Sequence, residues 1–88
     1  MRRSSISKPF GLTIRRRRVA AGLSQERLAE LAGLHPTYIS MVEHGVRNPT
    51  LDAAAGIAKG LRVALPKLLE EAQQQNANRT EESPNTEL

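Results

Sequence analysis

The sequence predicts an all-α domain, on three observations. Apolar residues recur at helical spacing in five segments between residues 9 and 72. No segment shows the alternation of apolar and polar residues that is typical of a strand, and Gly, Pro, Ser and Thr stand between the segments. A domain of 88 residues buries only a modest fraction of its surface, so association with a second copy is a reasonable expectation.

The first helix is expected to begin near Pro9–Gly11 and to run to Ala21, where Gly22 supplies a left-handed stop. Phe10, Ile14 and Ala21 can face inward. The four consecutive arginines after Ile14 wrap around nearly all of one turn. They therefore cannot share one role, and at least one of them must point toward the protein.

The second helix is the segment QERLAELA, which follows Ser24, a good N-cap. Gly33 ends it, and only Gly-Leu-His separates it from the third helix. Pro36 suits the first turn of that third helix, because its missing N–H costs nothing there. The residues that the second helix is expected to bury are Leu28, Leu31 and Ala32.

The third helix is expected to run from Pro36 to His44 and has two different faces. Its apolar side consists of Leu34, Ile39 and Val42. Its other side is a stripe at helical spacing formed by Thr37, Ser40, Met41 and His44. That stripe carries no Lys or Glu, although a solvated helix face usually does. An uncharged polar stripe predicts a surface that contacts a partner.

The fourth helix follows Thr50, which is expected to cap it, and ends at Leu61. Gly56 and Gly60 in its interior indicate either a tolerated weakness or close helix packing. Its expected inner face consists of Leu51, Ala54, Ile57, Ala58 and Leu61. A fifth helix starts near Leu65–Pro66. Its apolar residues are Leu68, Leu69 and Ala72.

Three regions follow from this organisation. Residues 1–8 are expected to be a disordered basic arm, residues 9–72 the folded domain, and residues 73–88 a disordered acidic and polar tail. The formal net charge of +4 divides unevenly, since residues 1–69 carry +8 and residues 70–88 carry −4. A strongly basic folded part favours a polyanionic partner, either nucleic acid or an anionic membrane surface.

Several function classes find no support in the sequence. There is no cysteine, so neither a disulfide nor a thiolate metal site is available, and His35 and His44 are not at a ligand spacing. No metalloprotease motif, phosphate-binding loop or nucleophile constellation is present, so we expect no enzyme, no cofactor and no small-molecule ligand. No apolar run is long enough for a signal peptide or a membrane span, which predicts a cytoplasmic protein without a membrane partner.

Two short helices joined by a three-residue turn that contains glycine are a recurring DNA-binding unit. Ala29 is small where the second helix must approach the third, and Gly33 supplies the turn. Ile39 and Val42 anchor the third helix to the core. Each of these requirements is common alone, but together at this spacing, inside a basic all-α domain, they are much rarer.

The segment from Leu23 to Leu61 resembles the Cro/C1-type (XRE) helix-turn-helix regulators of bacteria and phages. With the first and fifth helices, the resemblance covers about residues 10–70. It implies a five-helix, lambda-repressor-like domain that binds double-stranded DNA, and among such regulators the chain is most similar to restriction–modification controller proteins and compact phage-type repressors. The family positions present in register are Leu23, Ser24, Gln25, Leu28, Ala29, Ala32, Gly33, Ile39, Ser40, Glu43, Gly45, Pro49, Ile57, Ala58 and Leu61.

The resemblance also implies roles for single residues. Arg18 and Glu43 match an ion pair that ties the first helix to the recognition helix, which leaves the other three arginines of the run largely solvated. The residues that match base-contacting positions are Pro36, Thr37 and Met41, with Arg47 placed to reach a phosphate or a base edge. The residues that fit backbone contacts are Gln25, Tyr38, Ser40 and His44.

This recognition helix departs from many relatives because it lacks Arg, Lys, Asn and Gln, the strong base readers. Specificity should therefore depend on methyl contacts, on Arg47 and on DNA shape. One such helix reads few base pairs, so we expect a homodimer on a two-fold symmetric operator, with autoregulation of its own operon as repressor or activator. The expected dimer interface consists of Leu61, Val63, Leu65, Leu68 and Leu69.

Two other roles stay open. The chain could be the antitoxin of a toxin–antitoxin pair, or an anti-activator that binds another regulator in place of DNA. The tail after Ala72 is almost free of apolar residues, which argues against an antitoxin extension that folds on a toxin. Gln25 and the basic surface argue against an anti-activator.

Overall fold

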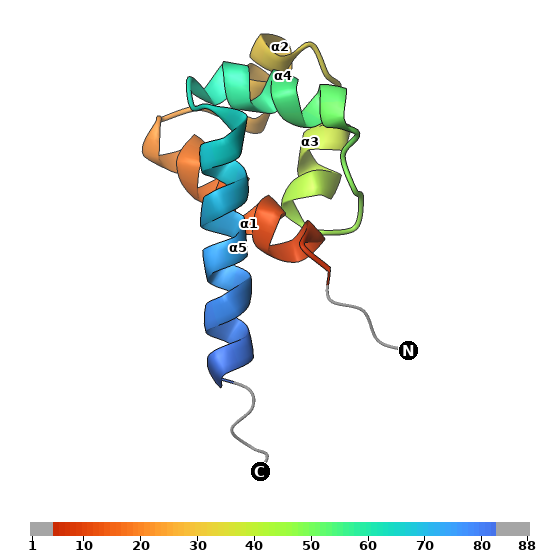
Figure 1. The fold of residues 1–88 in the computed structure, drawn as a ribbon. Coiled ribbons are helices and arrows are strands. Elements are labelled where there is room, and N and C mark those ends of the chain that lie inside the picture. Colours follow the sequence, from red (N-terminus) through yellow and green to blue (C-terminus); the bar gives the residue numbers. More distant parts are fainter. Residues whose placement is uncertain (1–4, 83–88) are drawn as a thin grey trace.

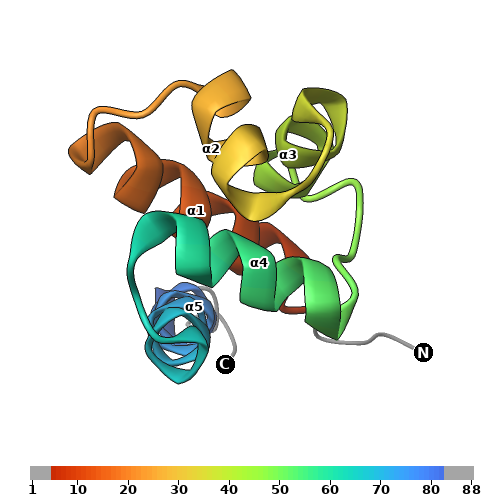
Figure 2. The same cartoon turned by 90° about the horizontal axis from the view of Figure 1, so that it is seen from above.

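The computed structural model describes residues 5–82, with side chains through residue 76, and places five helices there (Figure 1). They are α1 (Ser7–Ala20), α2 (Gln25–Ala32), α3 (Pro36–Glu43), α4 (Leu51–Leu61) and α5 (Leu65–Glu82). α4 packs chiefly on α2, α5 packs on α1, and α3 contacts both α1 and α2. Figure 2 shows α2 and α3 together on one side of α1 and α4, with α5 seen end-on across the layer. The predicted all-α, five-helix fold is confirmed.

The helix boundaries follow from local chemistry. The Ser24 hydroxyl accepts a hydrogen bond from the Arg27 amide at 2.9 Å, and the Thr50 hydroxyl accepts one from the Ala53 amide at 3.0 Å. Gly33 ends α2 in the left-handed conformation, with φ of 72°. The predicted caps and stops are therefore confirmed.

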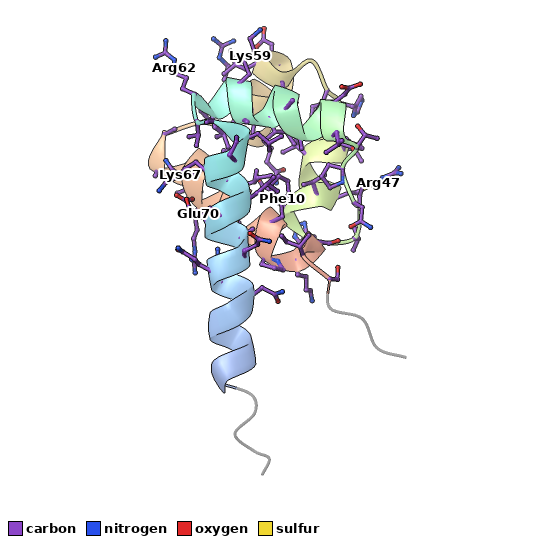
Figure 3. The ribbon with its side chains drawn as sticks, viewed as in Figure 1. Phe10, Arg47, Lys59, Arg62, Lys67 and Glu70 are labelled. Carbon is purple, nitrogen blue, oxygen red and sulfur yellow. The ribbon has the colours of Figure 1, made fainter. Side chains whose placement is uncertain are left out.

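The core lies where the inner faces of all five helices meet. Its largest fully buried side chains include Ile14, Leu28, Ile39, Ile57 and Leu68. Phe10, which Figure 3 shows pointing into the centre, is also buried. Ala54, Ala58 and Ala72 fill the space where helices approach closely.

Three apolar residues that were predicted to be buried are exposed. Leu31 is 41% and Leu51 81% exposed, and Ala21 lies in the turn after α1. Helices of eight and eleven residues have few turns, so a position at the edge of the inner face or in the first turn can miss the core. Ala29 and Ala53, which have smaller side chains, are buried.

The interior glycines of α4 mark this close packing. A Cβ atom at Gly56 would lie 2.7 Å from the Ala32 carbonyl oxygen, and one at Gly60 would lie 2.9 Å from a methyl carbon of Leu28. Of the two explanations that the sequence left open, the structure supports close helix packing. The lost helix propensity, roughly 1 kcal/mol per glycine, is offset by contacts that a larger residue would prevent.

The predicted ends of the folded domain differ from the structure. α1 begins at Ser7, within the predicted arm, and residues 1–4 lie outside the described residues. α5 continues through Glu82, so the prediction of disorder is wrong for residues 73–82. That stretch is Gln, Asn, Ala, Arg, Thr and Glu without Gly or Pro, so it can extend a helix already anchored by Leu68 and Ala72. Within residues 5–82 no helix is long and apolar enough to cross a membrane.

Candidate nucleic-acid interface

The uncharged stripe of α3 lies on the surface of the domain. Thr37 and His44 are exposed, and Ser40 and Met41 are partly exposed. On the opposite side of the helix, Ile39 and Val42 are 0% and 1% exposed. The helix is therefore fixed by its apolar side and presents a smooth face without charges, which can approach the edges of base pairs without burying a charge.

A buried ion pair fixes the C-terminal end of α3 to α1. The Arg18 guanidinium donates two hydrogen bonds to the Glu43 carboxylate, at 2.6 and 3.1 Å, and a third to the Leu23 carbonyl at 2.8 Å. The side chains of Arg18 and Glu43 are only 12% and 1% exposed. Hydrogen bonding to Glu43 raises the pKa of Arg18, so the pair stays charged where a bidentate geometry is most effective. The pair that the resemblance implied is present.

Gln25 joins the same network. Its side-chain amide donates to the Glu43 carboxylate at 2.9 Å, so the first residue of α2 is tied to the last residue of α3. The sequence assigned Gln25 only to a phosphate contact. Its backbone N–H lies at a helix N-terminus, which suits an anion. The hydrogen bond to Glu43 sets the position of that N-terminus relative to α3.

A second glycine contact brings α1 against α3. Gly11 is buried, and a Cβ atom there would collide with the Val42 carbonyl oxygen and lie 2.8 Å from the Glu43 carbonyl oxygen. Nothing in the sequence singled out Gly11, because a glycine near the start of a helix is also typical of a helix boundary. It sets the closest approach of α1 to α3.

The loop after α3 holds the remaining candidate contact. The Arg47 guanidinium lies over the Tyr38 ring, 5.5 Å from its centroid, and Arg47 is exposed at this end of the molecule (Figure 3). Tyr38 packs partly against the core, so its ring is a firm base for the arginine. Ser7 hydrogen-bonds Asn48, which ties the loop to the start of α1. The sequence placed Tyr38 on the DNA backbone and did not foresee its contact with Arg47.

His35 caps the recognition helix, a role that the sequence did not reveal. Its Nδ1 atom accepts a hydrogen bond from the Thr37 amide at 3.2 Å, directly at the end of α3 that carries Pro36 and Thr37. Histidine is not among the preferred N-cap residues, so only the structure shows it.

His35→Asp should strengthen this cap and weaken DNA binding. A carboxylate accepts the same amide and suits the helix N-terminus, so the free energy of unfolding should rise by about 0.5–1 kcal/mol. The added negative charge would repel phosphates, so affinity for any duplex should fall. Urea unfolding and fluorescence anisotropy measure the two effects. His35→Asn caps without a charge and should stabilise without loss of affinity. Equal weakening by both would show that His35 itself contacts DNA.

Arg17 differs from the expectation of a solvated side chain. It forms an ion pair with Glu71 of α5, in which the Arg17 Nε atom donates to Glu71 Oε1 at 3.1 Å. Beside it, the Gln75 amide donates to the buried Thr13 hydroxyl at 2.7 Å. Glu71 therefore helps to fix α5 to α1.

The Arg17–Glu71 pair predicts a pH dependence of stability. Hydrogen bonding from Arg17 lowers the pKa of Glu71, so the folded state favours the carboxylate. The contribution of Glu71 is present above the usual glutamate range and is lost as the pH falls through the lowered pKa. The difference in unfolding free energy between wild type and Glu71→Gln should therefore be constant near neutrality and should shrink below about pH 4. The Glu70 carboxylate lies 4.0 Å from Lys67, and both of these side chains are exposed. Glu70→Gln should therefore change the free energy of unfolding by less than Glu71→Gln does.

The predicted dimer interface is only partly on the surface. Leu61 and Leu68 are 7% and 0% exposed and belong to the core, so assigning them to an interface was wrong. Leu61 belongs to α4, which packs chiefly on α2, and Leu68 belongs to α5, which packs on α1, so both side chains lie in the shared core. Val63 and Leu65 are half-buried on the core, and Leu69 is 36% exposed.

The helix-turn-helix family matches residues 14–68, which contain α2, α3 and the stripe. The chain belongs to this family. The chain is therefore a DNA-binding regulator of the Cro/C1 type. Its α2 is the first helix of the helix-turn-helix motif, and its α3 is the recognition helix.

Three relatives of this helix-turn-helix regulator carry the same description. Control protein C.SmaI from Serratia marcescens is 55% identical over 47 residues, which are 53% of this chain and 56% of that protein. Control protein C.BamHI from Bacillus amyloliquefaciens is 44% identical over 62 residues, 69% of this chain and 76% of that protein. The restriction-modification controller protein C.AhdI from Aeromonas hydrophila, known from a crystal structure, has 40% sequence identity to this chain. The two structures superpose with a TM-score of 0.68 over 72% of this chain and 94% of that one. This regulator thus spans about half of the length of C.SmaI and most of the other two.

Proposed function

We propose that this regulator binds a two-fold symmetric operator as a homodimer and controls transcription of its own operon, as the controller of a restriction–modification system. The observation that carries DNA binding is the exposed, uncharged face of α3, held from behind by the buried pair of Arg18 and Glu43. A recognition helix must keep its angle to the rest of the domain to reach base edges. The role is binding, and no step of it calls for catalysis.

Base readout is proposed for a small set of residues. Pro36, Thr37 and Met41 line the face of α3, and Thr37 and Met41 can contact thymine methyl groups. The Arg47 guanidinium, which lies over the Tyr38 ring, can rotate away from it to donate hydrogen bonds to a guanine edge or to a phosphate. Backbone contacts are proposed for Gln25, Tyr38, Ser40 and His44.

Hydrogen bonds within the domain orient two of the residues proposed for backbone contacts, His44 and Gln25. The His44 ring nitrogen Nδ1 donates to the Ser40 carbonyl oxygen at 2.8 Å, which fixes the orientation of the exposed ring for a proposed backbone contact. The Gln25 amide is held by Glu43, which leaves the backbone N–H groups at the start of α2 for an anion.

The controller role rests on the three control proteins, and the homodimer on the need to read more base pairs than one helix can. Two recognition helices related by a two-fold axis would contact half-sites about 34 Å apart. The half-buried Val63 and Leu65 and the exposed Leu69 lie at the junction of α4 and α5, where a second copy can cover them.

The experiment is a titration by fluorescence anisotropy of the DNA upstream of this gene, and of a scrambled duplex, at several salt concentrations. We expect preference for the upstream DNA, two subunits per site, and a salt slope that reports several phosphate contacts. Equal affinity for the two duplexes would contradict autoregulation at that site.

Thr37→Ala and Gln25→Ala should separate base readout from backbone binding. Thr37→Ala should lower affinity for the operator about fivefold, with little change on scrambled DNA, because it removes a base contact. Gln25→Ala should weaken both duplexes about equally, because it removes the hydrogen bond to Glu43 that positions the α2 N-terminus for a phosphate. The same titration gives both ratios, and an unchanged specificity ratio in Thr37→Ala would show that the stripe does not read bases.

A further inference from the structure

The first turn of α1 packs against the loop that follows the recognition helix (Figure 1). Lys8 lies over Gly45, the second residue after α3, since a Cβ atom on Gly45 would lie 2.6 Å from Lys8 Cγ and 3.1 Å from Lys8 Cα. Beside it, the Ser7 hydroxyl donates to the side-chain oxygen of Asn48. Two consecutive residues of α1 therefore hold the loop at both of its ends.

Glycine is suited to this contact in conformation and in size. The φ of Gly45 is 74°, in the left-handed region that glycine adopts without strain. Its amide donates to the Val42 carbonyl at 3.0 Å, and the Val46 amide donates to the Met41 carbonyl at 3.0 Å, which closes α3 with a glycine turn. The turn is thereby fixed to the end of α3, and the place of the missing side chain is taken by the stem of Lys8.

The ammonium group of Lys8 has no acidic partner in the described part of the chain. Lys8 is exposed, and within residues 5–76 no acidic side chain pairs with it or with Arg47. Of the two acids that flank the loop in sequence, Glu43 is buried in its pair with Arg18, and Asp52 forms no ion pair with either cation. The surface at the loop therefore carries positive charge that is available to an anion.

This cation lies next to residues that are proposed to contact DNA. Gly45, on which Lys8 packs, stands in the chain between His44 and Arg47, and both of these residues are exposed. When a duplex receives a helix in its major groove, its phosphates lie along the rims of that groove. The stem of Lys8 therefore leads toward the rim at the C-terminal end of α3.

We infer that Lys8 binds a phosphate of the DNA backbone and that Gly45 positions it there. The inference rests on the DNA contacts proposed above and adds a further one to them. Because Cβ and Cγ of Lys8 pack on Gly45, only the outer part of the stem has to be ordered on binding, which lowers the entropic cost of the contact. A phosphate contact carries no sequence information, so Lys8 contributes affinity for any duplex and leaves the preference for the operator unchanged.

Lys8→Gln tests the inference by fluorescence anisotropy with the DNA upstream of this gene and with a scrambled duplex. Affinity for both duplexes should fall about tenfold at low salt, and the ratio of the two affinities should keep its wild-type value. The slope of log K against log salt should become shallower by about two for a dimer, since each protomer gives up one phosphate contact. Lys8→Arg keeps the charge and should keep the wild-type slope.

Lys59→Gln is the matched control, because it makes the same change of charge on α4. Figure 3 shows Lys59 on a different side of the domain from Arg47, so this variant should keep the wild-type slope. Both lysines are exposed, so both variants should keep the wild-type midpoint of urea unfolding. A lowered midpoint in Lys8→Gln would overturn the inference, because the lysine would then serve the fold.

Three binding results would also contradict the inference. An equal loss of slope in Lys8→Gln and Lys59→Gln would overturn it, because net charge alone would explain both. A lower operator preference in Lys8→Gln would overturn it as well, since the lysine would then read a base. Wild-type binding by Lys8→Gln would overturn the inference alone, whereas a wild-type protein that binds neither duplex would overturn the proposed DNA contacts with it.

The positioning role of Gly45 is tested in a double-mutant cycle. Gly45→Ala adds a Cβ atom where Lys8 packs, and it should lower affinity for both duplexes under conditions where circular dichroism shows the variant to be folded. In the Lys8→Gln background the same change should cause a smaller loss, because the phosphate contact that it displaces is already gone. An equal loss in the two backgrounds would show that Gly45 does not position Lys8.

Discussion

Arg18→Met should lower the free energy of unfolding by about 3–5 kcal/mol, because it leaves the Glu43 carboxylate buried without its counter-charge. Glu43 would keep only the hydrogen bond from Gln25, and its side chain is 1% exposed. The Leu23 carbonyl would lose its donor as well. The loss is a large part of the stability of a small domain. Urea unfolding followed by circular dichroism measures it.

Three comparisons make the result specific. Arg15→Met changes an exposed arginine of the same run and should cost less than about 0.5 kcal/mol. Arg18→Lys keeps the charge but cannot donate two parallel hydrogen bonds to the Glu43 carboxylate. Its free energy of unfolding should therefore lie between those of wild type and Arg18→Met, and it can be measured even where Arg18→Met does not fold. Arg18→Met with Glu43→Leu should recover part of the loss. If Arg18→Met had the same free energy of unfolding as wild type, the ion pair of Arg18 and Glu43 would not be what holds α3 to α1.

The local chemistry of the chain made much of the fold predictable. Ser24, Gly33 and Thr50 are strong boundary residues, and each caps or ends a helix at its own position without help from distant parts of the chain. Ile39 and Val42 are three residues apart on a short helix between two such boundaries. Their burial, and therefore the exposure of the opposite stripe, followed from spacing alone.

The parts that were missed depend on distant partners. Arg17 meets Glu71 across 54 positions of sequence, and spacing within one helix cannot show such a contact. Leu51 has a suitable phase for burial but stands in the first turn of α4, where nothing covers it. The pair of Arg18 and Glu43 came from the resemblance to a family, because the run of four arginines does not reveal which one turns inward.

The extension of α5 shows a different limit. The polar stretch 73–82 lacks an apolar period, and absence of a period was taken as disorder. A helix that is already nucleated and anchored can continue through residues of moderate propensity with no further burial, because each added residue costs little once the first turns exist. The antitoxin alternative gains nothing from this extension, since residues 73–82 contain no large apolar side chain for a toxin.

Gly11→Ala should be more damaging than an alanine at either interior glycine of α4, Gly56 or Gly60. A Cβ atom there meets two backbone carbonyl oxygens of α3, at Val42 and Glu43, and neither can rotate away as a side chain would. In an open helix the change would stabilise by roughly 1 kcal/mol through propensity. Here the clash should outweigh that gain and lower the free energy of unfolding by about 3 kcal/mol.

The damage should also reach DNA recognition, because the clash moves α3 relative to α1 and strains the pair of Arg18 and Glu43. Under conditions where Gly11→Ala is folded by circular dichroism, operator affinity should fall by more than affinity for scrambled DNA. Gly60→Ala is the matched control, since the nearest atom to its Cβ is a methyl carbon of Leu28 that can shift, and it should cost less than about 1 kcal/mol with specificity intact. If Gly11→Ala matched Gly60→Ala in both stability and specificity, the close approach of α1 would not set the position of the recognition helix.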